Sequence, residues 1–504
     1  MAEVRDYKLY IDGQWTDAAS GETFETTNPS DGSVVGRVSR AGKEDMRRGI
    51  EAARKAFDSG VWADMPQEER SRRMLKAWEA LTAALPVLSQ IEAEDAGHTL
   101  RMANLFSIAL GVEHWRVLAQ LSSTIGEYEA VPWNDFPAVQ WGIVRREPYG
   151  VTAAITPWNF PFILMMWKAA PSLATGNSIV IKPATYTPLS TLEFARILQE
   201  TDLFPPGVIN VVPGAGAAAG EELASNPMVD KVAFTGSTEV GRRIMQLASS
   251  TVKKVTLELG GKSANILLDD ADLDIAIPGS LWATFLHSGQ ICHSGTRLFV
   301  PASLHDEVIA RLVETAEGLK IGSALDFETD MGPLVHRSQY ETVERYVQSG
   351  LEEGAKLVTG GERALVPGCD GGYFYKPTIF TDVNNEMKIA QEEIFGPVLS
   401  VIKYETVEDA IAMANDSIYG LGGGVWSRDI PRALNVAKRI RTGTVWINDY
   451  HLLNAYAPFG GYKQSGVGRE LGAWGLREYQ QTKYIHVDQV PSKDQKFWLQ
   501  ILGL

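Results

Sequence analysis

The chain of 504 residues has a formal net charge of −15, 45% hydrophobic residues and two cysteines. Its length exceeds the size at which one hydrophobic core stops growing, so two or more domains are expected. The negative charge argues against binding to nucleic acid or anionic membranes, because both interactions depend on Lys and Arg. Two cysteines cannot form a disulfide framework or a four-thiolate metal site, and no apolar run has the length of a membrane span or signal peptide. The composition therefore predicts a cytoplasmic protein with no metal site.

The first predicted elements are helices. Two apolar sets recur at helical spacing: Met46, Ile50, Ala53 and Phe57 within 43–58, then Met74, Trp78, Leu81 and Leu85. From about residue 139, short β-rich runs such as "SIVIKPAT" and "KVAFTGS" alternate with helix-compatible stretches. Buried strands that alternate with helices are typical of a doubly wound α/β sheet. A second series of the same kind follows residue 262.

The boundary between the two series is expected near residue 260, at the paired glycines Gly260 and Gly261. Two segments, 138–150 and 482–489, look like strands without partner helices. They are expected to pair with each other as an arm.

A turn that could bind phosphate follows one predicted strand, in "VAFTGSTEVGRRI" (232–244). Gly236 and Gly241 would let a phosphate approach the N-terminus of the next helix, and the hydroxyl of Ser237 would be a further donor. An ordinary strand-to-helix turn is the alternative, because this is not the G-x-G-x-x-G pattern.

The next predicted strand ends in a carboxylate. Alternation puts Val255, Leu257 and Leu259 on one face and Thr256 and Glu258 on the other. Ligands gather outside the carboxyl ends of strands in open α/β sheets, which makes Glu258 a candidate site residue. A solvent-facing or salt-bridged glutamate is the alternative.

Other polar groups stand at the ends of strands or in loops. Asn159, between two prolines in "ITPWNFPF", could donate an N–H toward developing negative charge, or simply form a turn. Lys182 would bind a ribose hydroxyl or cap a strand. Glu393 and Phe395, before a Gly-Pro turn, would contact a ligand or belong to an ordinary loop.

Cys292 lies in "HSGQICHSGTR" (287–297), where small residues leave room for a molecule to approach the thiol. Free cysteines are often simply buried, but the neighbours of this one do not look like core. Cys369 lies in a glycine-rich loop with no candidate base near it in sequence, so a catalytic role for it is not expected.

Taken together, "PWNF", "FTGSTEVG", "ELGGKS", "GQICHSGTR", "EEIFGPV" and "PFGGYKQSGVGRE" resemble the aldehyde dehydrogenase superfamily in order and spacing. The resemblance implies two doubly wound α/β domains plus a β-arm oligomerisation domain, in a dimer or a tetramer built as a dimer of dimers. The coenzyme-binding domain would comprise residues 1–125 and 149–260, and the catalytic domain residues 261–464. The arm would comprise residues 126–148 and 480–490, followed by a C-terminal tail, 491–504.

The resemblance also implies NAD(P)-dependent, hydrolytic and non-acylating oxidation of an aldehyde. Cys292 corresponds to the nucleophile that forms a thiohemiacetal and then a thioester. Asn159 and the backbone N–H of Cys292 correspond to the oxyanion hole, and Glu258 to the base that activates water. Lys168 matches a position sometimes assigned to proton relay.

The implied cofactor positions are Ile155, Thr156, Pro157, Trp158, Lys182, Thr185, Thr235, Gly236, Ser237, Val240, Gly241, Leu259, Glu393 and Phe395. Thr185 stands where members committed to NAD often carry a glutamate, which would repel a 2′-phosphate. NAD is therefore expected as the preferred cofactor, with NADP also used.

The positions that match the substrate tunnel are Phe160, Ile163, Leu164, Trp167, Ile291, His293, His451, Leu453 and Phe459. Most are apolar and none is an arginine, which favours an aromatic or medium-chain aliphatic aldehyde over a phosphate or dicarboxylate. Betaine aldehyde or an amino-aldehyde is the alternative. A quaternary ammonium group binds best in a cage of aromatic rings. Trp167 and Phe160 could form part of such a cage, but Leu286 and Leu453 are not aromatic.

Three rival functions remain for such a chain: a semialdehyde dehydrogenase that acylates coenzyme A, a γ-glutamyl phosphate reductase-like enzyme, and a non-enzymatic crystallin-like relative. The presence of Glu258 argues against the first two, and Cys292, Glu258 and Asn159 together against the third. The apolar end "FWLQILGL" (497–504) is expected either to be a disordered tag or to dock on its own or a neighbouring subunit, with the tunnel mouth as one place for it.

Overall fold

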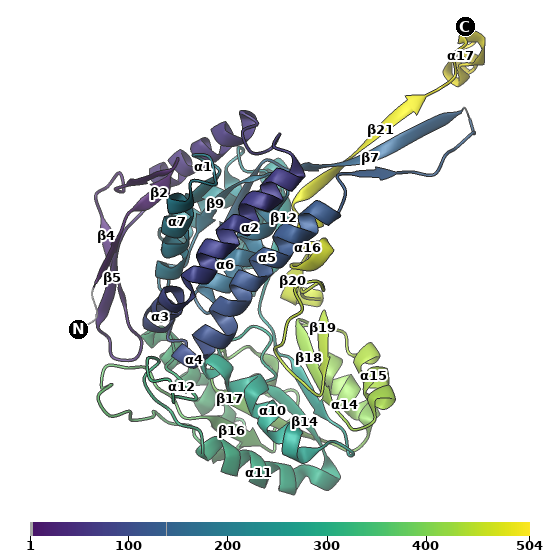
Figure 1. Ribbon diagram of the computed structural model, residues 1–504. Coiled ribbons are helices and arrows are strands. Elements are labelled where there is room, and N and C mark those ends of the chain that lie inside the picture. The colour runs from purple at the N-terminus through teal and green to yellow at the C-terminus, as the bar shows by residue number, and fades with distance from the viewer. Residues whose placement is uncertain (1–3, 138) are drawn as a thin grey trace.

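The computed structural model describes residues 4–137 and 139–504. The described residues form four β-sheets, with helices packed around the two larger ones (Figure 1). Residues 1–3, which begin the predicted coenzyme-binding domain, and Ala138, the first residue of the predicted strand 138–150, lie outside the described residues.

The larger sheet has five parallel strands in its centre and antiparallel pairs at both edges. In order across the sheet, its strands are β20 (Gly466–Val467), β12 (Lys254–Glu258), β11 (Lys231–Thr235), β8 (Val151–Ile155), β9 (Ser178–Lys182), β10 (Ile209–Val211), β2 (Leu9–Ile11) and β3 (Gln14–Thr16). One face packs on α1 (Lys43–Asp58), α8 (Glu221–Ser225) and α9 (Thr238–Ala248). The other packs on α2 (Gln67–Ala83), α5 (Ile108–Thr124), α6 (Pro161–Ala174) and α7 (Leu189–Thr201).

The second sheet is built in the same way. Its strands, in order, are β15 (Lys356–Thr359), β16 (Thr378–Thr381), β17 (Val398–Tyr404), β14 (Arg297–Pro301), β13 (Ala264–Leu267), β18 (Gly422–Trp426) and β19 (Thr444–Ile447). All pairs are parallel except β15 with β16. Helices α10 (Leu273–Phe285) and α11 (His305–Glu317) cover one face. Helices α12 (Arg337–Glu352), α13 (Lys388–Gln391), α14 (Val407–Asn415) and α15 (Ile430–Arg439) cover the other, so both predicted α/β sheets are doubly wound.

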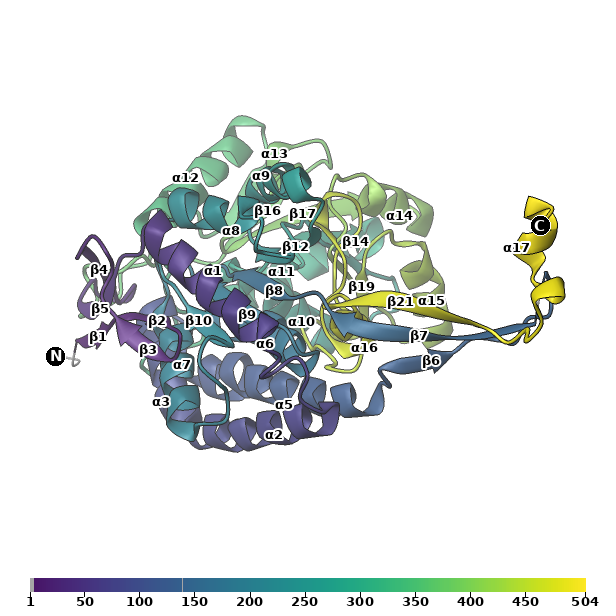
Figure 2. The same ribbon diagram turned by 90° about the horizontal axis from the view of Figure 1, so that it is seen from above.

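The two isolated strands pair as predicted. β7 (Gln140–Pro148) and β21 (Gln480–Asp488) are antiparallel along their whole length, with β6 (Tyr128–Ala130) beside β7. This arm projects from the body in both views, and α17 (Phe497–Leu502) lies beyond its end (Figures 1 and 2). A fourth sheet, of β1 (Arg5–Tyr7), β5 (Val34–Ser39) and β4 (Thr23–Thr27), lies near the N-terminus.

Two details differ from the sequence predictions. The helix expected to run through Leu85 stops at Ala83, and Leu85 starts α3 (Leu85–Ala96), because Pro86 fits only the first turn of a helix. The predicted domain ranges left residues 465–479 unassigned. In the structure these residues belong with the first sheet: β20 pairs with β12, and α16 (Gly472–Arg477) packs on α5 and α6. No helix within the described ranges is long and apolar enough to cross a membrane.

Candidate active site

Cys292 lies in a loop after α10 that buried contacts hold in place. The side chain of Gln290 accepts the backbone N–H of Val335 at 2.9 Å and donates to the carbonyl of His287 at 3.0 Å. His287 and Ser288 both adopt left-handed backbone conformations (φ 49° and 54°). A left-handed backbone conformation costs free energy in residues other than glycine. Contacts with the surrounding structure must therefore hold this loop in its conformation.

The thiol of Cys292 is partly buried, and its surroundings favour the protonated form over the thiolate. Burial raises its pKa above the usual value, and the neighbouring carboxyl groups of Glu393 and Glu258 raise it further. Backbone N–H groups of His293 and Cys292 act in the opposite direction. Because the thiolate is the nucleophilic form, the site needs a base or a positive charge near the sulfur before Cys292 reacts.

Glu258 ends β12, and the predicted alternation is confirmed. Leu257 and Leu259 pack in the core beneath α9, while Thr256 and Glu258 face the other side. Glu258 is 4% exposed, so the solvent-facing alternative is wrong. Burial raises the pKa of its carboxyl well above the usual value, and repulsion from Glu470 adds to the rise. A buried carboxyl whose pKa is raised holds a proton more readily than an exposed one, which suits the role of a general base.

A buried ion pair stands next to this carboxyl. The Nζ of Lys168, on α6, donates to Oε1 of Glu470 at 2.9 Å, and both side chains are almost fully buried. Lys168 also lowers the pKa of Glu258, in opposition to Glu470. Sequence reasoning included Lys168 and missed Glu470, which lies far along the chain in the segment that returns to the first sheet.

The amide of Asn159 is oriented by a buried network. Its Nδ2 donates to the carbonyl of Gln290 at 2.8 Å, and its backbone carbonyl lies 2.7 Å from Nε2 of His98. Burial lowers the pKa of His98 to about 4, so this ring is neutral and donates one N–H. An amide has two N–H donors, and no described residue accepts the second N–H of Asn159.

A cavity of about 260 Å³ opens on one side of Cys292. Eight of the predicted cofactor residues line it: Pro157, Trp158, Thr235, Gly236, Ser237, Leu259, Glu393 and Phe395. Predicted positions outside this wall are Ile155, Thr156, Lys182, Val240 and Gly241, which lie on β8, β9 and α9 and their ends, and Thr185, which lines a separate cavity. Sequence reasoning missed Gly260, Gln339, Thr342 and Ile394, which also line it.

The wall of this cavity carries groups that suit the phosphate and sugar parts of a dinucleotide. Ser237 caps the N-terminus of α9, where unpaired backbone N–H groups favour phosphate. The hydroxyl of Thr235 is buried with no hydrogen-bond partner among the described residues. Glu393 accepts the backbone N–H of Gly261 at 3.0 Å, and a Cβ on Gly260 would meet its other oxygen at 2.4 Å. This fixed carboxyl, whose pKa burial raises to about 7, is suited to a sugar hydroxyl.

Cys292 also lines a second, narrow cavity of about 40 Å³. All nine residues predicted for the substrate tunnel line it, together with Asn159, Cys292 and Phe106, which was not predicted. Burial lowers the pKa of His293 to about 3 and that of His451 well below its usual value, so both rings are neutral. The two cavities share Asn159, Leu164 and Cys292, so the thiol lines both the apolar cavity and the cavity that contains the turn at Gly236 and Ser237.

The second cysteine of the chain, Cys369, does not line either cavity. Cys369 is buried in a small cluster with Ala364 and Phe374. Within the described residues, no group of three or more His, Cys, Asp or Glu is placed to hold a metal ion.

Comparison with known proteins matches residues 15–485 to the aldehyde dehydrogenase family. Betaine aldehyde dehydrogenase of Bacillus subtilis is 45% identical over 96% of this chain and 98% of that protein. The mitochondrial aldehyde dehydrogenase of Mesocricetus auratus is 42% identical over 98% and 97% of the two chains. The NAD+ complex of an aldehyde dehydrogenase from Bacillus cereus is 44% identical, with a TM-score of 0.93 over 96% and 97% of the two chains.

The fold is therefore that of an oxidoreductase with two α/β domains. The chain belongs to the aldehyde dehydrogenase family.

Proposed function

We propose that this chain oxidises an aldehyde to its carboxylic acid through a thioester on Cys292. The observation that carries the proposal is the position of Cys292 in the shared wall of two cavities. One of them fits the apolar part of an aldehyde and the other a dinucleotide. A carbonyl carbon bound to the sulfur would lie beside both.

In the first step the Cys292 thiol loses its proton to solvent, and the resulting thiolate attacks the carbonyl carbon to give a thiohemiacetal. The alkoxide would be stabilised by the free N–H of Asn159 and the backbone N–H of Cys292. NAD+, when bound, supplies the hydride acceptor. Loss of hydride from the former carbonyl carbon leaves a thioester on Cys292.

The second step is hydrolysis of the thioester. Glu258 takes a proton from water, the resulting hydroxide attacks the thioester carbon, and the thiolate of Cys292 leaves. The acid is released, and the proton on Glu258 must return to solvent. We propose the pair Lys168–Glu470 as part of that route, because its charges already act on the pKa of Glu258.

We propose NAD as the preferred cofactor, with NADP also accepted. Bound NAD+ in the relative from Bacillus cereus supports the preference for NAD. For the use of NADP, Thr185 carries no charge that would repel a 2′-phosphate. Steady-state kinetics with each cofactor test this part of the proposal. A ratio of kcat/KM for NAD to that for NADP far above about a hundred would refute the use of NADP.

We propose an aromatic or medium-chain aliphatic aldehyde as substrate. The narrow cavity contains neutral histidines and no side chain that is charged at neutral pH. A quaternary-ammonium aldehyde is the second candidate. The specific observation in its favour is that Phe106 joins Phe160, Trp167 and Phe459 around this cavity, which makes the ring lining fuller than the sequence indicated.

The experiment is to follow NADH formation from NAD+ with benzaldehyde, octanal and betaine aldehyde, with and without coenzyme A. We expect turnover without coenzyme A and kcat/KM highest for one of the first two substrates. Cys292→Ala should form no NADH, whereas Cys369→Ala, the matched control, should behave as wild type. Glu258→Gln should give one burst of NADH and little further turnover. Absence of NADH with every aldehyde, or turnover only with coenzyme A, would refute the proposal.

We also propose that the arm mediates homo-oligomer formation, as a dimer or a dimer of dimers, in a cytoplasmic protein. The exposed apolar side chains of the arm and tail support it, among them Trp133, Phe136, Trp498 and Ile501. The tail lies beyond the end of the arm and away from the body of its own chain (Figures 1 and 2), so docking on the tunnel mouth would need a neighbouring subunit.

A further inference from the structure

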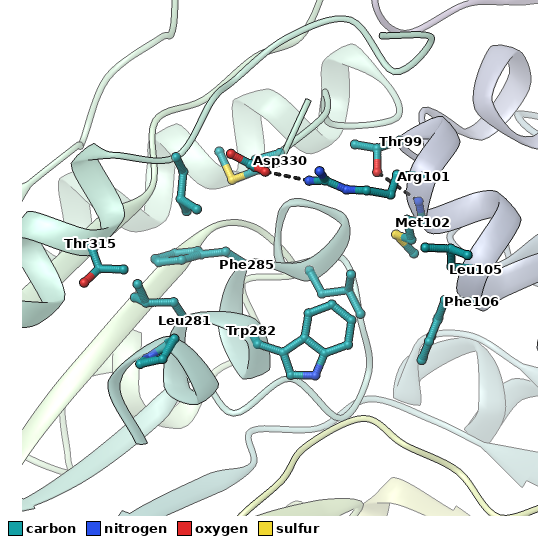
Figure 3. A pocket seen from close by; sticks show the side chains of 14 residues that line it. Thr99, Arg101, Met102, Leu105, Phe106, Leu281, Trp282, Phe285, Thr315 and Asp330 are labelled. Carbon is teal, nitrogen blue, oxygen red and sulfur yellow. Dashed lines mark hydrogen bonds and ion pairs between the residues drawn. The ribbon is translucent and has the colours of Figure 1, made fainter. Parts of the chain in front are cut away.

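A cavity of about 380 Å³ lies outside the narrow substrate cavity, between the two α/β domains. One wall is the segment from Thr99 to Phe106, which includes α4 (Leu100–Met102) and the π-helical turn η1 (Ala103–Ser107). The other is formed by α10, α11 and the segment around Asp330 (Figure 3). Its volume lies within the range of about 300–1,000 Å³ of cavities that hold small organic ligands, and such sites favour domain interfaces.

The lining is apolar, and the two charges on it are paired. Ten of the fourteen lining residues are apolar. The guanidinium of Arg101 lies 2.5 Å from the carboxylate of Asp330, as the dashed line in Figure 3 marks. With these charges cancelled, the cavity offers no counter-charge to an ionic ligand. It suits a neutral apolar chain or ring.

Two aromatic residues separate this cavity from the site of Cys292. Phe106 lines both cavities. Its ring meets that of Trp282 edge to face, with centroids 6.0 Å apart. The ring of Trp282 in turn lies 5.6 Å from that of His451 in the narrow cavity. Among the described residues, Phe106 is thus the one side chain common to the two cavities, and it stands in a π-helical turn, a feature that often marks functional sites.

We propose that the outer cavity is a second binding subsite for the substrate, which takes the distal apolar part of a long aldehyde past Phe106. The inference rests on the proposed function of Cys292 and narrows the substrate class. A short aldehyde would fill only the narrow cavity. An aldehyde with a long alkyl chain would reach the outer cavity, which we call the outer subsite, by displacing the ring of Phe106 from its contact with Trp282.

The expected signature is a dependence of kcat/KM on chain length. Each methylene that leaves water for an apolar site contributes about 0.8 kcal/mol, or about fourfold in kcat/KM. For the wild-type chain, kcat/KM should therefore keep rising from propanal to decanal. If instead kcat/KM is flat or falls beyond the length that fills the narrow cavity, the inference is wrong while the proposed function stands.

Two variants test the outer subsite from opposite walls. Leu105→Glu puts a charge on a rim side chain that is 72% exposed, and Thr315→Trp on α11 fills the cavity from the far side (Figure 3). Each should lower the ratio of kcat/KM for decanal to that for propanal at least tenfold. The ratio cancels any general loss of active protein. The matched controls are Leu365→Glu, a leucine 85% exposed elsewhere, and Glu314→Trp, next to Thr315 but outside the lining. Both should keep the wild-type ratio, and unchanged ratios in both test variants would overturn the inference.

A binding measurement separates this inference from the proposed function. Decan-1-ol, which has no carbonyl group, can be titrated calorimetrically into the wild-type, Leu105→Glu and Leu365→Glu chains. Binding that is weakened at least tenfold by Leu105→Glu alone would support the outer subsite even if no aldehyde were oxidised. Equal binding to all three chains, or none to the wild type, would overturn it.

Discussion

Gly261, the second of the paired glycines after Glu258, lies against the backbone of Cys292, and we expect its replacement to displace the nucleophile. A Cβ on Gly261 would lie 2.2 Å from the carbonyl oxygen of Cys292. Close contacts between carbon and a carbonyl oxygen begin at about 3.3 Å, so Gly261→Ala requires a displacement of about 1 Å. The atom that must move is the carbonyl oxygen of Cys292, which belongs to the backbone of the nucleophile itself. Since a misplacement of about 1 Å can cost about 100-fold in rate, we expect kcat to fall by roughly that factor.

The assay is steady-state NADH formation, with the folded state checked by thermal unfolding and the thiol by its rate of alkylation. Gly42→Ala is the matched control, because a Cβ there meets no heavy atom within 4 Å and the backbone φ of −96° suits alanine. It should keep the wild-type kcat. A folded Gly261→Ala chain with kcat within about threefold of wild type would refute the link between this close approach and catalysis.

Three further predictions concern the buried charges and the tail. Glu470→Gln removes a negative charge that raises the pKa of Glu258, so this pKa should fall. The acid limb of the pH profile of thioester hydrolysis should then move to lower pH. An acid limb that does not move would contradict this prediction. Lys168→Met leaves the carboxylate of Glu470 buried without its cation and should lower the free energy of unfolding by about 3–5 kcal/mol, whereas the double change with Glu470→Leu should recover part of it in denaturant titrations. An unaltered midpoint in the single variant would show that the pair adds nothing. Deletion of 491–504 should weaken the oligomer or change KM, and unchanged sedimentation and kinetics would dismiss a docking role for the tail.

Local sequence patterns were sufficient for several parts of the molecule. Strand alternation put Glu258 opposite the two leucines that pack in the core, because successive side chains of a strand point to opposite faces. Helical spacing gave α1 its full range. The resemblance supplied nine residues that line one cavity, since those positions follow motifs that stand in order along the chain.

Other features depend on which distant segments the two sheets and their helices bring together. Glu470 meets Lys168 because the chain returns to the first sheet through β20, a strand of two residues with no periodic signal. Phe106 separates two cavities because a π-helical turn faces α10 from the other domain. Gly261 appeared in the sequence as a domain boundary, and the structure shows a close approach to the carbonyl of Cys292. The sequence by itself thus determined the periodic elements and the family of the chain. The tertiary structure decided which groups surround the thiol, since contacts between residues far apart in the chain depend on packing that no local pattern encodes.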